Sequence, residues 1–88
     1  IRPIEHGAKF VWHSASKYLN GHGDVMLGVV VGPRTETRKI RGISSLFGLN
    51  ANPFECWLAS RGLRTLPLRM ERVSQSAQRI AEFLARQP

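Results

Sequence analysis

Hydrophobic and polar positions fall into separate blocks in the first third of the chain. Residues 9–13 are mostly bulky and apolar and predict a short buried strand. Residues 14–24 are polar and rich in glycine, which predicts a loop. Residues 25–32 are apolar and β-branched almost throughout and favour a second strand that is covered on both faces. Ahead of these blocks, residues 2–7 predict a helix end or turn that a glycine closes.

The remaining sequence predicts helices. Residues 35–46 form one, which Thr35 can cap. The last helix can be capped by Thr65, with Pro67 tolerated in its first turn. Apolar residues recur in it at spacings of three and four and define one face of an amphipathic helix: Met70, Val73, Ala77, Ile80 and Leu84.

A further helix lies between these two. Asn52 can cap it, with Pro53 at the first helical position and Glu55 at the third, which is a capping-box arrangement. We expect this helix to stop near Gly62. Two strands followed by helices fit an α/β architecture.

The charge balance is strongly basic, with 13 Lys+Arg against 6 Asp+Glu and a formal net charge of +7. Such a charge permits nucleic acid or an anionic membrane as a partner. A small basic nucleic-acid-binding module without catalysis is therefore the alternative function. The basic residues are nevertheless scattered, and no basic run carries interleaved aromatic residues as in single-strand binders, so we expect no nucleic acid partner. One local cluster stands out: Arg34, Arg38, Lys39 and Arg41.

Length and cysteine content narrow the class further. The chain has 88 residues, enough for one small core. Its single cysteine, Cys56, excludes an internal disulfide and fits a reducing compartment. No run of about 18 apolar residues occurs, so we expect no transmembrane helix and no membrane partner.

The richest candidate chemistry lies at the end of the first predicted strand. Lys17 follows two serines, Ser14 and Ser16, which lie on the same side of an extended backbone. A lysine that loses its proton is a nucleophile, and hydroxyls donate hydrogen bonds to phosphate without adding charge. The three residues together suit a phosphorylated aldehyde. From spacing alone, an ordinary strand end followed by a polar loop remains open.

Other patterns in the chain carry less chemistry. Three histidines and Asp24 match no common zinc spacing, so no metal is expected, and His22 is better explained as a hydrogen-bonded structural residue. Residues 14–17 also read as Ser-x-x-Lys, but a strand rather than a helix start leads into them, which disfavours a β-lactamase-like site. Four arginines could suggest a carboxylate site, although pairing on a helix surface, for instance with Glu71, is preferred: Arg61, Arg64, Arg69 and Arg72.

The lysine run resembles the lysine motif of the trans-sulfuration (Cys/Met metabolism) family of pyridoxal-phosphate-dependent enzymes. Ser16 stands where the family has threonine, Lys9 replaces the usual acidic residue, and Leu27 stands where many members carry glycine. A second stretch, 53–58 with 61–71, resembles the segment downstream of the family's lysine. The residues of the first motif that match are Phe10, Ser14, Ala15, Lys17, Tyr18, Leu19, Gly21, His22 and Gly23.

The resemblance implies an α/β fold of the aspartate-aminotransferase-like kind, fold type I. Residues 1–66 would be the end of the large cofactor-binding domain, and residues 67–88 an amphipathic helix that leads toward a C-terminal domain outside this chain. Family members are several times longer, and the chain begins without an initiator Met. We therefore expect it to be an internal fragment, inactive by itself.

The resemblance also implies a function. Lys17 would be the Schiff-base lysine that holds pyridoxal 5′-phosphate and then moves protons at the substrate, while Ser14 and Ser16 would bind the cofactor phosphate. The substrates would be sulfur amino acids or homoserine esters, and the reactions γ-replacement or β- or γ-elimination. The full-length enzyme would be a cytoplasmic homo-oligomer, a dimer or tetramer.

Overall fold

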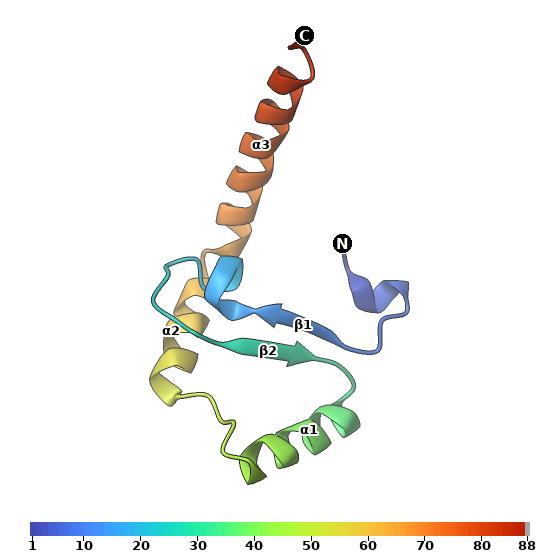
Figure 1. Cartoon of the computed structure of the whole chain (residues 1–88), viewed down its shortest axis with the longest axis vertical. Coiled ribbons are helices and arrows are strands. Elements are labelled where there is room, and N and C mark those ends of the chain that lie inside the picture. The colour runs from blue at the N-terminus through green and yellow to red at the C-terminus, as the bar shows by residue number, and fades with distance from the viewer. Residues whose placement is uncertain (88) are drawn as a thin grey trace.

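The computed structural model describes residues 1–87 as a strand pair with helices at one end and along one side (Figure 1). The elements in chain order are the 3₁₀ helix η1 (Pro3–His6), strand β1 (Val11–Ser14), π-helix η2 (Ala15–Leu19), strand β2 (Gly28–Val31), and the α-helices α1 (Arg34–Leu46), α2 (Pro53–Leu63) and α3 (Leu66–Leu84). The short helix η2 joins four of the other elements, because it packs against both strands and against α2 and α3.

The two strands pair antiparallel, with Val11 opposite Val31 and Ser14 opposite Gly28. Both strands are confirmed, although their ends differ from the predicted ones. β1 begins and ends later than the predicted range of 9–13, and β2 is shorter than the predicted range of 25–32. The expectation that the second strand is covered on both faces is wrong for residues 1–87, since Val30 and Val31 are each almost half exposed. The physical reason is that β2 packs mainly against β1 and η2 in this part of the chain. A β-branched run indicates a strand but does not supply the layer that covers it.

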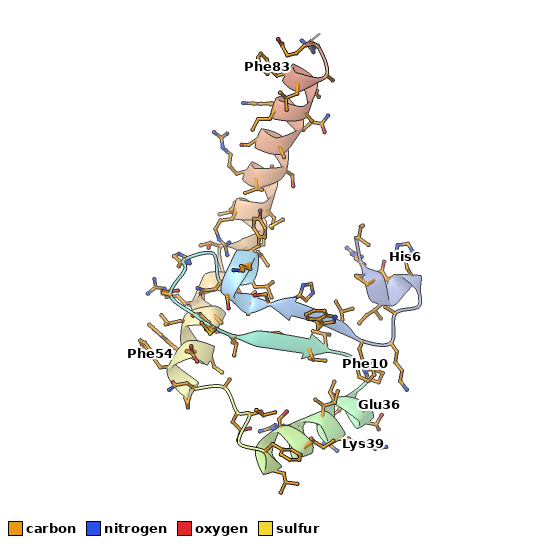
Figure 2. The ribbon with its side chains drawn as sticks, viewed as in Figure 1. His6, Phe10, Glu36, Lys39, Phe54 and Phe83 are labelled. Atoms are coloured by element: carbon orange, nitrogen blue, oxygen red, sulfur yellow. The ribbon has the colours of Figure 1, made fainter. Side chains whose placement is uncertain are left out.

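The predicted turn at the N-terminus is confirmed as η1. Gly7 ends it with a left-handed conformation at φ 89°, and its backbone N–H bonds back into the helix. Between η1 and β1, the ammonium of Lys9 lies 2.9 Å from a carboxylate oxygen of Glu36 in the first turn of α1. Figure 2 shows Phe10 and Glu36 at this corner, where the chain ahead of β1 meets α1.

The helix predicted for residues 35–46 is confirmed, but its cap is not Thr35. The helix begins at Arg34, and Pro33 occupies the cap position without a side-chain hydrogen bond. The Thr35 hydroxyl instead donates to the carboxylate of Glu36, and the Thr37 hydroxyl donates to the carbonyl of Pro33 at 3.0 Å. The hydroxyl of Thr35 therefore serves a side chain inside the first turn.

The cap of α2 is confirmed. The side-chain oxygen of Asn52 accepts a hydrogen bond from the backbone N–H of Phe54 at 2.8 Å. The other hydrogen bond of a capping box would join the Glu55 carboxylate to the backbone N–H of Asn52. That part of the prediction is wrong, because the Glu55 carboxylate accepts instead from the backbone N–H of Met26 at 3.3 Å. Glu55 thereby joins α2 to the segment ahead of β2.

The predicted end of α2 near Gly62 is confirmed, because the helix ends at Leu63. Gly62 is buried inside the helix. Thr65 occupies the predicted cap position of α3, but its side chain makes no capping hydrogen bond. Thr65 has helical dihedral angles, and its hydroxyl donates to the carbonyl of Gly62 at 3.2 Å. α3 then begins at Leu66, and the predicted division of the chain between residues 66 and 67 stays a prediction.

Burial is concentrated around η2. The buried apolar residues within residues 1–87 are Ala15, Val25 and Ala59, and Asn20 is a buried polar one. The apolar face of α3 is mostly exposed, with Ile80 at 58% and Val73 at 40%. Figure 1 shows α3 extending away from the strand pair, and the labelled Phe83 lies near its far end in Figure 2. The best-packed part of the chain is therefore the segment that carries the lysine.

Candidate functional site

The strand β1 delivers the chain directly into the lysine segment. Its last residue, Ser14, pairs with Gly28, and the next backbone N–H, that of Ala15, donates to the carbonyl of Leu27 at 2.8 Å. Ala15 is almost fully buried. Strand pairing and this burial together fix the position at which η2 begins, immediately before the candidate residues.

The hydroxyl of Ser16 is oriented by the backbone of the neighbouring strand. The N–H of Leu27 donates to Ser16 Oγ at 3.0 Å, which uses an oxygen lone pair and leaves the hydroxyl proton for another acceptor. Ser14 and Ser16 both line a hollow of about 330 Å³, beside Trp12 and Met26. The structure thus brings the two predicted phosphate-binding residues to one surface depression.

Lys17 lines a second, larger hollow of about 730 Å³. It interrupts the regular geometry of η2, with φ −94° and ψ −125°, and its carbonyl accepts from the N–H of Gly21 at 2.7 Å. The Lys17 side chain is exposed. Ser16 lines both hollows, whereas Ser14 lines only the smaller of these two. Ser16 therefore lies between the hollow lined by Lys17 and the hollow lined by Ser14.

The glycine-rich turn after Lys17 is held together by its own polar groups. Asn20 is 1% exposed, and its side-chain N–H donates to the carboxylate of Asp24 at 2.6 Å. This hydrogen bond is the main reason that the pKa of Asp24 is lowered from its ordinary value. His22 Nδ1 lies 2.6 Å from the Asn20 carbonyl, which can only accept, so Nδ1 carries the proton. The interpretation of His22 as a hydrogen-bonded structural histidine is confirmed.

The sequence-based prediction for Arg69, near the start of α3, is wrong. It assigns Arg69 to a helix surface, in a pair with a residue such as Glu71. Its guanidinium instead donates to the backbone carbonyls of the turn after Lys17, at 2.6 Å for Tyr18 and 3.2 Å for Leu19. The two segments are about fifty residues apart in the chain, so no local spacing could have indicated the contact.

Metal binding and membrane insertion are the other two possibilities that the residues of the chain raise. Within the part of the chain that the structure describes, no group of three or more His, Cys, Asp or Glu residues is placed to hold a metal ion. None of the helices in residues 1–87 is both long enough and apolar enough to cross a membrane. Lys17, Ser14 and Ser16 thus remain the residues of chemical interest.

The donor set fits a phosphorylated aldehyde. A phosphate needs donors, and Ser16 retains a free hydroxyl proton because its oxygen already accepts from Leu27. An aldehyde needs an accessible amine, and Lys17 is exposed and lines the neighbouring hollow. The two requirements are met by residues that adjoin in the sequence and share one surface.

The comparisons with known proteins point in one direction. A family model described as "Cys/Met metabolism PLP-dependent enzyme", where PLP is pyridoxal 5′-phosphate, matches residues 1–88. L-methionine gamma-lyase of Porphyromonas gingivalis is 49% identical over 89 residues, covering 99% of this chain and 22% of that protein. Cystathionine gamma-lyase of Saccharomyces cerevisiae is 44% identical over 84 residues, covering 94% and 21%.

Solved structures agree. Cystathionine gamma synthase from Xanthomonas oryzae pv. oryzae matches with a TM-score of 0.91 at 38% identity, covering 98% of this chain and 22% of that chain. Cystathionine gamma-lyase from Lactobacillus plantarum matches with the same TM-score at 39% identity, covering 99% and 23%. The predicted α/β class, as part of the fold of these enzymes, is confirmed, and the chain spans about a fifth of the length of its relatives.

The resemblance seen in the two sequence motifs is therefore confirmed over nearly the whole chain, and the alternative of a nucleic-acid-binding module is not supported by these matches. The chain belongs to the family of Cys/Met metabolism enzymes that depend on pyridoxal 5′-phosphate.

Proposed function

We propose that this chain is the lysine-bearing part of an enzyme that uses pyridoxal 5′-phosphate to act on sulfur amino acids or homoserine esters, by γ-replacement or by β- or γ-elimination. The observation that carries the proposal is the placement of an exposed Lys17 beside Ser16, whose hydroxyl proton is free because Leu27 N–H occupies its oxygen. Family membership supplies the cofactor class.

In this proposal Lys17 has two tasks. Its Nζ would hold the cofactor covalently, and once released by the substrate amine, the same atom would accept and return protons at the substrate. The cofactor, when bound, supplies an electron sink for the negative charge that develops on substrate carbon. The exposed position of Lys17 over the larger hollow leaves room for its long side chain to swing between these tasks.

Ser14 and Ser16 would bind the cofactor phosphate. Both line the smaller hollow, and a neutral hydroxyl donates to a phosphate oxygen without changing the charge of the site. Ser16 is the better-defined donor of the two, because the Leu27 N–H fixes the direction of its oxygen. We expect Ser16→Ala to weaken cofactor binding more than Ser16→Thr, which keeps the hydroxyl.

The substrate is proposed only as a class. The relatives include proteins named methionine gamma-lyase, cystathionine gamma-lyase, cystathionine gamma-synthase and canavanine gamma-lyase, at similar identity to this chain. The proposed class therefore covers both elimination and replacement. We also propose, on the family resemblance alone, that the full-length protein is a cytoplasmic homo-oligomer and that its partners are small-molecule amino acids.

The test uses the natural full-length protein that contains this chain. It is incubated with pyridoxal 5′-phosphate, reduced with borohydride to make the linkage permanent, digested, and mapped by mass spectrometry. The chain offers two internal controls, because Lys9 and Lys39 are its only other lysines. We expect the reduced cofactor on Lys17 and none on Lys9 or Lys39, and Lys17→Arg should abolish the label. A label elsewhere in the protein, with Lys17 unmodified, would overturn the proposal.

A further inference from the structure

The three carbonyls that directly follow Lys17 accept hydrogen bonds from one cation, Arg69. Arg69 donates from one terminal nitrogen to the Tyr18 carbonyl at 2.6 Å. Its other terminal nitrogen donates to the carbonyls of Leu19 at 3.2 Å, Asn20 at 3.4 Å and Gly62 at 2.9 Å. Three consecutive backbone carbonyls of the lysine turn are thus bound by a single guanidinium from α3.

The carbonyls of Tyr18 and Leu19 need such a partner because of where η2 ends, whereas the Asn20 carbonyl also accepts from His22 Nδ1 at 2.6 Å. The last carbonyls of a helix have no partner within the helix, and they carry partial negative charge. In η2 the carbonyls of Ala15 and Lys17 accept from the N–H groups of Asn20 and Gly21. The following three carbonyls are the ones that Arg69 binds, and a guanidinium, with five N–H donors in a fixed plane, can serve several of them at once.

The guanidinium is itself held in place. Its Nε donates to the hydroxyl of Thr65 at 3.1 Å, and that hydroxyl donates in turn to the carbonyl of Gly62. All three nitrogens of Arg69 therefore donate to protein acceptors, which leaves the side chain little freedom to act as a mobile binding group. Gly21 also makes room for it, because a Cβ at that position would collide with the guanidinium.

We propose that Arg69 is a positioning residue for Lys17, which fixes the backbone on the C-terminal side of the lysine and so sets the point from which its side chain reaches the cofactor. The inference rests on the proposed function of Lys17. It gives Arg69 no contact with substrate or cofactor and assigns its effect to the turn it clamps. Arg72, which lines the same hollow without bonding these carbonyls, supplies charge there but no clamp.

The experiment compares variants of the full-length protein. Arg69→Gln removes the clamp, and Arg69→Lys keeps the charge but offers one compact ammonium in place of a planar fork. Arg72→Gln removes a charge from the same hollow and leaves the clamp intact. Thr65→Val removes only the hydroxyl that seats Arg69, and Thr65→Ser retains it. This last pair serves as the milder arm if Arg69→Gln does not fold.

Two readouts are taken. Hydrogen exchange of the apo protein is followed in the peptide that contains the Asn20 and Gly21 amides, whose bonds to Ala15 and Lys17 close the turn. The rate of cofactor loss from the holoenzyme is followed by its absorbance. We expect Arg69→Gln and Arg69→Lys to accelerate both the hydrogen exchange and the cofactor loss by about tenfold or more. A change of this size corresponds to the loss of one hydrogen bond from a charged donor. Thr65→Val should show a smaller acceleration in the same direction.

The control variants define the results that would overturn the inference. Arg72→Gln and Thr65→Ser should leave the exchange of this peptide at the wild-type rate. Exchange and cofactor loss that stay at the wild-type rate in both Arg69→Gln and Thr65→Val would overturn the inference, as would equal acceleration by Arg72→Gln. The exchange arm involves no cofactor. Failure of borohydride labelling at Lys17 in the unmodified protein would count against the proposed function, whereas normal labelling with unaffected Arg69 variants would count against the positioning role only.

Discussion

The bare α-carbon of Gly62 in α2 lies directly against the buried Asn20 of the lysine turn. A Cβ on Gly62 would collide with the Asn20 carbonyl oxygen and would lie 2.9 Å from the Asn20 α-carbon. This close approach explains why a glycine stands inside α2, where it weakens the helix intrinsically. The glycine allows α2 and the lysine turn to pack backbone to backbone.

Gly62→Ala should therefore destabilise the full-length protein. The added methyl group must push the Asn20 backbone away, and overpacking of this kind costs about 1–3 kcal/mol. Gly42→Ala is the matched control, because Gly42 is also inside a helix and a Cβ there meets nothing within 4 Å. Gly42→Ala should be neutral or stabilising by up to about 1 kcal/mol. Thermal unfolding of the two variants tests this, and equal melting temperatures would contradict it.

Gly21→Ala and Gly23→Ala form a second matched pair. Both glycines have positive φ, 74° and 71°, so alanine should cost about 1–2 kcal/mol at either position. Only the Cβ at position 21 would also displace the guanidinium of Arg69, since nothing lies within 4 Å of a Cβ at position 23. We expect Gly21→Ala to lose cofactor faster than Gly23→Ala in dilution assays. Equal loss from the two variants would show that turn strain, and not the displaced guanidinium, sets the rate of cofactor loss.

The carboxyl group of Glu36 gives a prediction about pH. Its pKa is lowered from 4.5 to about 2, first by the hydrogen bond from Thr35 and next by Lys9. Because the folded-state pKa is depressed, this stabilisation is complete above pH 4.5 and is lost as pH falls toward 2. In Glu36→Gln, the melting temperature should depend less steeply on pH in this interval than in the unmodified protein.

Two further variants separate the causes. Thr35→Val should raise the pKa of Glu36 more than Lys9→Met does, because the Thr35 hydrogen bond is the larger cause. The chemical shift of the Glu36 carboxyl carbon, followed against pH, measures both. The reverse order would mean that the ion pair with Lys9 dominates.

The 88-residue chain in isolation should not unfold cooperatively. Three apolar residues are buried within residues 1–87, while Trp12 and Met26 are more than four-fifths exposed. That burial is too small to offset the conformational entropy of a chain this long. Far-ultraviolet circular dichroism should show helix that melts gradually, with weak near-ultraviolet bands from Trp12 and Trp57. A sharp transition in both regions would contradict this expectation.

The features predicted correctly from the sequence are those that depend on interactions between residues close together in the chain. The Asn52-Pro53 start of α2 is confirmed because a cap and the proline after it act within one turn. Gly7 ends η1 for the same kind of reason. The order of strand, lysine turn, strand and helices also follows from the blocks of apolar and polar residues, although boundaries shifted where Ser14 paired with Gly28.

The parts that the sequence did not predict depend on contacts between distant segments. Glu55 looked like half of a capping box, but a backbone N–H from residue 26 was available to it in the folded chain. Arg69 looked like one more helix arginine, and its role arises from carbonyls some fifty residues earlier. The roles of Lys17, Ser14 and Ser16 stay predictions, since structure and sequence give their placement and the labelling experiment gives their chemistry.

The distance along the chain between Lys17 and Arg69 has a consequence during synthesis. The turn after the lysine is synthesised well before Arg69, because the Tyr18 contact spans 51 positions. At a translation rate of about 5–20 residues per second, roughly 3–10 s pass between the two events. During that interval the nascent lysine turn has no guanidinium to close it. The order of synthesis therefore delays the finished lysine geometry until the helix joint that carries Arg69 has emerged and folded back.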